Sequence, residues 1–251
     1  MEKVIFLSDT HFKHRVATDD ERRKRRLFTS FIDDLEGLSR LYLLGDIFDF
    51  WFEHKGKEPG YYKDILRALS KLRNSGTRIF IIGGNHDYWL GNYIEEVIGI
   101  KILPQLHTEE IQGRIITMTH GDMLLKGEFG YKALKTIIRN RITIKLAGLI
   151  DPKLLFAFAG RFSRTSKGIT HKRTERAARE LIGRAGREFF RWGNDSFIMG
   201  HVHYPYHGRI DSKEFIILGD WEEHFSYALL EEGRFFLERY LPGKKTLSEN
   251  R

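Results

Sequence analysis

Short runs of apolar residues alternate with polar stretches along this chain, and their composition predicts secondary structure. The runs at 4–8, 40–45 and 78–83 consist mainly of Val, Ile, Leu, Phe and Tyr, which is typical of buried β-strands. Start and stop signals predict two helices: Asp19-Asp20 would cap one that runs to about 37, and Ser75-Gly76 would end one over 61–74. Further elements follow the same rules: a short helix at 90–98, strands at 101–106, 109–112, 114–119, 197–200 and 215–218, and a hairpin of 227–230 with 235–240.

This alternation of strands and helices predicts a layered α/β fold, and 251 residues are enough for one large core. The segment 126–192 interrupts the alternation, because it combines a helical pattern with Lys and Arg among Leu and Ile. We therefore predict a core made of 1–125 and 193–243, a helical insertion at 126–192 and a tail at 244–251.

The positive charge of the chain is concentrated in this insertion. The whole chain carries +8, whereas 126–191 alone holds 17 Lys and Arg against 5 Asp and Glu, so this segment carries +12 and the rest −4. Such a segment indicates an anionic partner. Two interpretations remain open: a helical subdomain with a solvated polar face, or a lid that contacts a membrane and binds an anionic lipid.

The composition also excludes several classes of protein. The chain has no Cys, so disulfides, thiolate nucleophiles and Cys-ligated zinc are ruled out. No apolar run approaches the roughly 20 residues of a membrane-spanning helix. The N-terminus enters a strand at once, so we expect no signal peptide and a cytoplasmic protein. Nothing in the sequence points to an obligate protein partner.

Five of the predicted strands end at Asp, His or Asn side chains. One such ending is ordinarily a surface or capping group, but five in one chain are explained together by a single site. The carboxyl ends of strands are where ligands bind in α/β sheets. The side chains at these ends are Asp9 and His11, Asp46 and Asp49, Asn85 and His86, His120 and Asp122, and His201 and His203.

These side chains include enough oxygen and nitrogen donors for two metal ions. Seven donors without sulfur are too many for one four-coordinate ion, and Asp46 is the natural bridging carboxylate. Two ions ~3.5–4 Å apart activate a shared water and stabilise phosphoryl transfer. Such donors accept Mn²⁺, Fe²⁺, Zn²⁺ or Mg²⁺. The seven predicted metal ligands are Asp9, His11, Asp46, Asn85, His120, His201 and His203.

His86 is left over from this set and is a candidate catalytic residue. A protonated imidazole beside the metals would stabilise the transition-state charge or protonate the leaving oxygen. Asp49 would hold His86 in one tautomer and favour its protonated form.

These clusters resemble the five motifs of the calcineurin-like metallophosphoesterases, in the order of that family. The motifs are Asp9-x-His11, Gly45-Asp46-x-x-Asp49, Gly84-Asn85-His86-Asp87, His120-Gly121-Asp122 and Gly200-His201-x-His203. The resemblance implies a two-sheet αββα sandwich, here with a helical lid insertion. It also implies that Asp9, His11, Asp46 and His203 hold one metal, and that Asp46, Asn85, His120 and His201 hold the other.

Within that family the chain looks most like the UDP-2,3-diacylglucosamine hydrolases of lipid A biosynthesis. The similar features are Leu43 to Phe48 followed by Trp51, the insertion after Asp122, and Leu218 to Trp221. The resemblance implies a manganese-dependent peripheral protein of the inner membrane that cleaves a pyrophosphate. The products would be UMP and 2,3-diacylglucosamine 1-phosphate. This chain departs from the best-studied members at His86, where they carry Arg.

The insertion would then bind the substrate. Its apolar residues, such as Leu146, Leu154 and Phe156, would form a wall for acyl chains. An alternative function on the same core is a nuclease or cyclic-nucleotide phosphodiesterase; the interleaved apolar residues argue against nucleic acid. A scaffold without chemistry is a further alternative, opposed by the complete ligand set. The predicted substrate-binding residues are Arg161, Arg164, Lys167 and Asp122.

Overall fold

The computed structural model describes the core and part of the insertion. The described residues are 2–35, 37–54, 56–58, 60–124, 140, 143, 146–157, 171–190 and 193–242. The predicted substrate-binding residues Arg161, Arg164 and Lys167 lie outside them, as do the two predicted boundaries of the insertion and the tail.

The first sheet contains the parallel strands that the N-terminal half of the sequence predicts. Its order is β11-β10-β1-β2-β3-β4. Neighbouring strands from β1 to β4 run parallel, whereas β10 is antiparallel to both β1 and β11. The bounds are β1 Lys3–Leu7, β2 Arg40–Leu44, β3 Arg78–Ile82, β4 Lys101–Leu103, β10 Ser226–Glu231 and β11 Arg234–Arg239.

The second sheet has the order β5-β6-β7-β9-β8. Its three inner strands β6, β7 and β9 are parallel, and an antiparallel strand closes each edge. The bounds are β5 Leu106–Ile111, β6 Arg114–Thr119, β7 Ser196–Met199, β8 Tyr206–Ile210 and β9 Lys213–Ile217.

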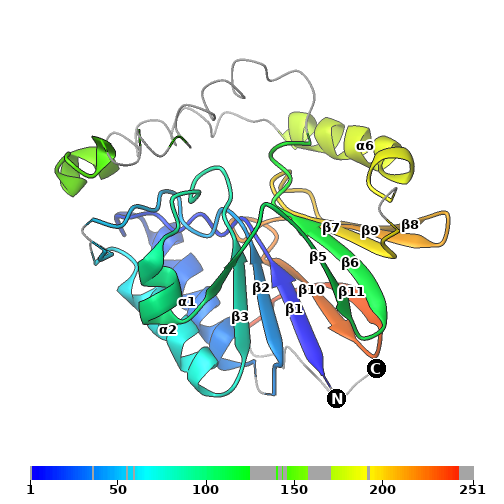
Figure 1. The fold of residues 1–251 in the computed structure, drawn as a ribbon, viewed down its shortest axis with the longest axis horizontal. Coiled ribbons are helices and arrows are strands. Elements are labelled where there is room, and N and C mark those ends of the chain that lie inside the picture. Colours follow the sequence, from blue (N-terminus) through cyan, green and yellow to red (C-terminus); the bar gives the residue numbers. More distant parts are fainter. Residues whose placement is uncertain are drawn as a thin grey trace.

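Helices cover the outer faces of both sheets (Figure 1). Alternate side chains of β1 show why, since Val4 and Phe6 pack between the sheets while Ile5 and Leu7 pack on the helical side. The helices α1 (Asp19–Asp33) and α2 (Lys63–Asn74) bury their apolar faces there. On the second sheet, α6 (His171–Glu188) packs against β7 and β9. The predicted αββα sandwich is therefore confirmed.

Three elements differ from the sequence prediction. The sequence missed β8, an edge strand that includes the half-buried Gly208 and the exposed Arg209 and therefore has no apolar run. The predicted strand 101–106 is split at Pro104, which has no N–H for a ladder, so β4 and β5 belong to different sheets. The predicted helix at 90–98 is a π-helix, η1, over Tyr93–Ile98.

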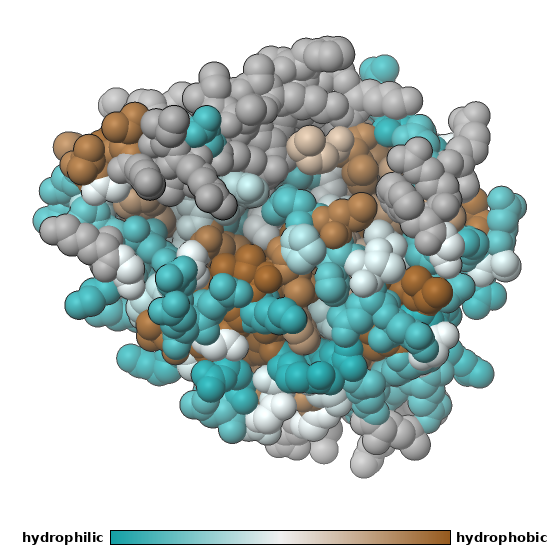
Figure 2. Space-filling model, viewed as in Figure 1, coloured by the Kyte–Doolittle hydropathy of each residue, from teal (hydrophilic) through white to brown (hydrophobic). Residues whose placement is uncertain are grey.

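In the described stretch 146–157 of the insertion, Phe156 packs on the core. Phe156 is only 1% exposed, and its ring lies 4.9 Å from that of Phe50 and 4.7 Å from that of Tyr61. It therefore packs on the core, although we predicted that it would line an acyl cavity. The same stretch, 146–157, also carries exposed leucines and an isoleucine, which form an apolar surface at the upper left of Figure 2. These are Leu146, Leu149, Ile150 and Leu154. Among the described helices, none combines the length and hydropathy that crossing a membrane requires.

Candidate active site

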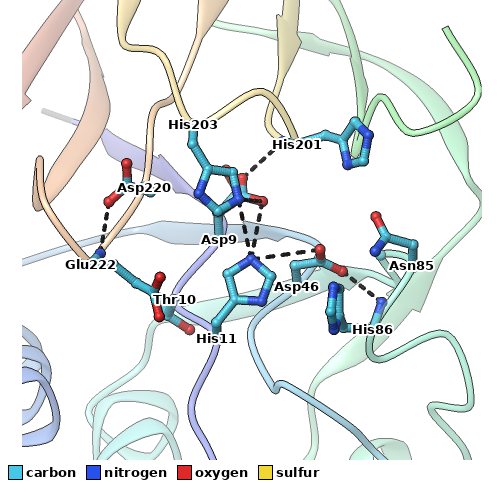
Figure 3. Close-up of polar contacts among 12 residues, drawn as sticks. Asp9, Thr10, His11, Asp46, Asn85, His86, His201, His203, Asp220 and Glu222 are labelled. Carbon is cyan, nitrogen blue, oxygen red and sulfur yellow. Dashed lines mark hydrogen bonds and ion pairs between the residues drawn. The ribbon is translucent and has the colours of Figure 1, made fainter. Parts of the chain in front are cut away.

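The predicted metal ligands follow five parallel strands, three in the first sheet and two in the second. Asp9 and His11 follow β1, Asp46 follows β2, and Asn85 follows β3. His120 follows β6, and His201 and His203 follow β7. Because the two sheets stack with these strand ends at one edge, the loops meet, and their side chains face one another (Figure 3).

The ligand loops adopt an unusual backbone conformation. Asp9, His11, Asp46, His201 and His203 all have positive φ angles, between 43° and 70°. This left-handed region costs a residue with a side chain about 1–3 kcal/mol. Hydrogen bonds between the loops offset this cost: the N–H of Asp9 donates to the carbonyl of Gly45 (3.1 Å), and the N–H of His11 to that of Asp46 (2.9 Å).

Glycines in the motifs let these loops approach closely. A Cβ added to Gly84 would overlap the Asp46 carboxylate, and one added to Gly200 would overlap the Ser8 hydroxyl and the Asp9 carboxylate. The glycines of the Gly-Asn and Gly-His pairs are therefore required because the loops pack too closely for a side chain.

Asp9, His11 and His203 form the first group of possible ligand atoms. The Nε2 atoms of His11 and His203 are 3.2 Å apart, and His203 Nε2 is also 3.2 Å from Asp9 Oδ1. Asp9 Oδ2 accepts hydrogen bonds from the Ser8 hydroxyl (2.5 Å) and the His201 N–H (2.9 Å). Its other oxygen, Oδ1, is buried and has no hydrogen-bond partner among the described residues. A cation between these atoms would satisfy that oxygen, so the donors fit a metal ion.

Asp46, His120 and His201 form the second group. Asp46 Oδ2 lies 3.4 Å from His120 Nε2 and 3.7 Å from His11 Nε2, so one carboxylate oxygen faces both groups. This arrangement suits the bridging role proposed from the sequence. Asn85 Oδ1 is 3.2 Å from His120 Nε2. His120 Nδ1 lies 2.9 Å from the Leu44 carbonyl, and donating to it would leave Nε2 free for a metal.

Carboxylates and imidazoles face one another in the site. Burial disfavours the charged form of His203 and His120, but Asp9 and Asp46 respectively outweigh this and raise each pKa to about 9. At His201, burial and the neighbouring His120 outweigh Asp46 and Asp9 and lower its pKa to about 3. The carboxylates thus favour the protonated forms of His203 and His120. Metal binding would release their protons.

His86 and Asp49 are adjacent, as the sequence predicted, but their nearest contact is different. His86 Nδ1 lies 3.1 Å from the backbone carbonyl of Asp49 and 3.8 Å from its carboxylate. The carbonyl would thus define the tautomer and leave Nε2 as the reactive atom. His86 also has a ring nitrogen within 4.8 Å of ligand atoms of His11 and Asp46, so this third group is a possible metal site too.

Asp87 positions the loops, a role that our sequence analysis did not recognise. Its side chain is fully buried and accepts four backbone hydrogen bonds. Oδ1 accepts from Asp46 (3.1 Å) and Gly84 (2.7 Å), and Oδ2 from Ile47 (2.7 Å) and Phe48 (3.2 Å). The carboxylate thereby joins the loops after β2 and β3. Its place in the Gly-Asn-His-Asp motif was the only signal in the sequence.

Two other features of the sequence bear on this site. Asp122, predicted to bind substrate, follows the ligand His120 by two residues, and its side chain is buried at only 3% exposure. The backbone N–H of Trp221 donates to the Asp9 carbonyl (3.1 Å), so the 218–221 segment supports the loop after β1.

Comparison with known proteins identifies the family. The model of the calcineurin-like phosphoesterases matches residues 2–205, most of the chain. The chain is a calcineurin-like phosphoesterase. Members of this family use divalent metals, so the prediction that the chain is a metal-dependent hydrolase is confirmed.

Curated relatives are similar over almost their entire length. UDP-2,3-diacylglucosamine hydrolase of Porphyromonas gingivalis is 26% identical and covers 94% of this chain and 97% of its own. Those of Pseudomonas fluorescens and Ectopseudomonas mendocina are 25% and 27% identical and cover 94% and 93% of this chain and 95% and 96% of their own. These relatives confirm the resemblance to the UDP-2,3-diacylglucosamine hydrolases that the sequence motifs indicated.

Solved structures are similar at low identity. An archaeal phosphodiesterase is 14% identical with a TM-score of 0.46, covering 94% of this chain and 98% of its own. The zinc complex of Vps29 from Entamoeba histolytica is 14% identical with a TM-score of 0.43, covering 95% and 98%.

Proposed function

We propose that this phosphoesterase hydrolyses the pyrophosphate of UDP-2,3-diacylglucosamine. The observation that carries the proposal is the similarity to hydrolases of that name over more than nine-tenths of both chains. This similarity extends over the insertion. The site also has two groups of side chains that could hold metal ions, and Asp46 faces both groups. Water adds to one phosphorus and the bridging P–O bond breaks, giving UMP and 2,3-diacylglucosamine 1-phosphate.

Residues of the chain would position and stabilise this reaction. Bound divalent ions supply Lewis-acid polarisation and an acidic water, and manganese is the ion that we propose. His86, 19% exposed in its side chain, would face the leaving phosphate and donate a proton or a hydrogen bond. Asp49 would orient that imidazole through its carbonyl.

The proposal also includes a membrane. The substrate carries two acyl chains, so a cytoplasmic enzyme must reach it at a lipid surface. Leu149 is 84% exposed, and Leu146, Ile150 and Leu154 are exposed beside it. Together with the basic insertion, this apolar surface suits peripheral binding to the anionic face of the inner membrane.

A comparison of kcat/KM for several substrates tests the proposal. The purified protein with Mn²⁺ is given UDP-2,3-diacylglucosamine in mixed micelles, and UMP release is measured. Bis(p-nitrophenyl) phosphate, cyclic nucleotides and DNA are assayed in parallel. We expect kcat/KM for the lipid to exceed the others by at least about a hundredfold. Faster hydrolysis of DNA or a cyclic nucleotide would replace this function with the alternative.

A further inference from the structure

A cavity of about 680 Å³ lies beside the ligand loop that follows β3. This volume falls within the roughly 300–1,000 Å³ of small-molecule sites. The strand β4 is parallel to β3, with Ile82 opposite Leu103, so both strands end at the same edge of the sheet. The cavity therefore opens on the edge that carries the metal ligands. Its lining includes Phe52, Gly83, Trp89, Asn92, Leu103 and Gln105.

One short segment connects the cavity to the candidate active site. Gly83 lines the cavity, whereas the next residue, Gly84, touches the Asp46 carboxylate, and Asn85 lies 3.2 Å from His120. The chain then returns to the cavity at Tyr88 and Trp89. A ligand held at the metal groups would need to extend past only this loop to enter the cavity.

The walls of the cavity include aromatic rings, glycine backbone and side-chain amides. The Trp89 ring packs edge-on against Phe52, with centroids 5.6 Å apart and planes at 64°, which holds its orientation. Gly83 and Gly91 leave parts of the wall without side chains. Such surfaces accommodate a planar ring, since bases stack on aromatic side chains and on flat walls.

The polar groups of the cavity include the two neutral amides of Asn92 and Gln105. Gln105 Nε2 donates to the Gly83 carbonyl (2.7 Å), which leaves its Oε1 to accept from a ligand. Asn92 is exposed, and its side chain makes no capping bond to η1. Glu53, the one carboxylate among the described lining residues, accepts hydrogen bonds from the backbone N–H groups of Gly91 and Tyr93, both at 3.0 Å. Its oxygens are thus engaged by the protein backbone, and the uncharged amides suit a neutral base.

We propose that this cavity is the nucleobase subsite of the enzyme, in which a pyrimidine stacks on Trp89 and bonds to the amides of Gln105 and Asn92. The inference rests on the proposed function in that the substrate is a nucleotide. It adds the residues that read the base. An acyl chain is less suited to the cavity, because its amides would lose water without gaining partners.

Binding of two matched probes tests the subsite without turnover. UMP and ribose 5-phosphate share the phosphate and the sugar and differ by the base, and calorimetry gives a Kd for each. We expect wild-type protein to bind UMP at least about tenfold more tightly, as base stacking predicts. Trp89→Ala should reduce this ratio to about twofold, and Trp89→Phe should retain most of it. Val97→Ala, an exposed position on η1 outside the cavity lining, is the control and should keep the wild-type ratio.

Two outcomes distinguish this inference from the proposed function. If the protein cleaves the UDP lipid but Trp89→Ala weakens UMP and ribose 5-phosphate equally, the subsite is wrong and the function stands. If the lipid is not cleaved but the UMP preference exists and depends on Trp89, the subsite stands and the function is wrong. Should Trp89→Ala fail to fold, Asn92→Ala replaces it, with a loss of at least about threefold in the ratio expected, and an unchanged ratio would overturn the subsite.

Discussion

The Asp87 carboxylate provides a quantitative test of how the ligand loops are held. In Asp87→Asn, one oxygen becomes an NH₂ group, which would face two backbone N–H donors at 2.7–3.2 Å. At least two buried N–H groups then lack an acceptor, at about 1–3 kcal/mol each. We therefore expect the free energy of unfolding to fall by about 2–6 kcal/mol. Because Asp46 and Gly84 lose their anchor, metal binding should weaken as well.

Urea unfolding of the chelator-treated protein measures the stability, and elemental analysis of the reloaded protein measures metal content. Asp195→Asn is a matched control, because Asp195 is less buried and accepts one backbone N–H bond, from Ile115 (2.8 Å). It lies where β6 and β7 begin, at the end of these strands away from the ligand loops. This substitution should cost less than about 1 kcal/mol and leave both metals bound. A loss below about 1 kcal/mol in Asp87→Asn, with wild-type metal content and activity, would refute the reasoning.

The remaining predictions concern the metals, the candidate catalytic residue His86, the insertion and one ion pair. Asp46→Asn should abolish hydrolysis and lower metal content with the fold intact, and more than a tenth of the wild-type rate with both metals bound would exclude a bridge. His86→Ala should cost roughly 10²–10⁴ in rate, and a lost metal in that variant would make His86 a ligand. Arg164→Ala should weaken cleavage of the lipid more than that of a small diester, and equal losses would leave the insertion a structural role alone. His224→Ala should destabilise the protein more at pH 5.5 than at pH 9, measured by urea unfolding, and equal losses would contradict this.

The sign of the last prediction follows from the ion pair. His224 Nδ1 lies 2.6 Å from Asp220 Oδ2; this hydrogen bond raises the pKa of His224, and it lowers that of Asp220 against the effect of burial. The His224 contribution is full below about pH 6.5 and is lost as the pH rises through the higher pKa of the folded state. The Asp220 contribution is present above about pH 3.9 and is lost at lower pH. The pair therefore stabilises the fold most between these limits.

Elements with a strong local signal were predictable. The strands β1, β2 and β3 are buried apolar runs, and the predicted hairpin is present as β10 and β11, joined through Glu232 and Gly233, which both have positive φ. The edge strand β8 was missed because exposed and half-buried residues alternate along it and one of them is glycine. Its pairing with β9 supplies the stability that its own composition lacks.

The sequence by itself determined the order of the elements, the family and the kinds of donor at the strand ends, because these depend on local periodicity and on short motifs. Only the tertiary structure decided which atoms meet. Asp46 faces both groups because two sheets stack, His86 contacts a carbonyl more closely than a carboxylate, and Asp87 joins loops that are about 40 residues apart. Phe156 likewise packs on the core although its neighbours suggested a lipid wall. Such contacts join residues distant along the chain, so no local pattern encodes them, and packing of the folded chain selects them.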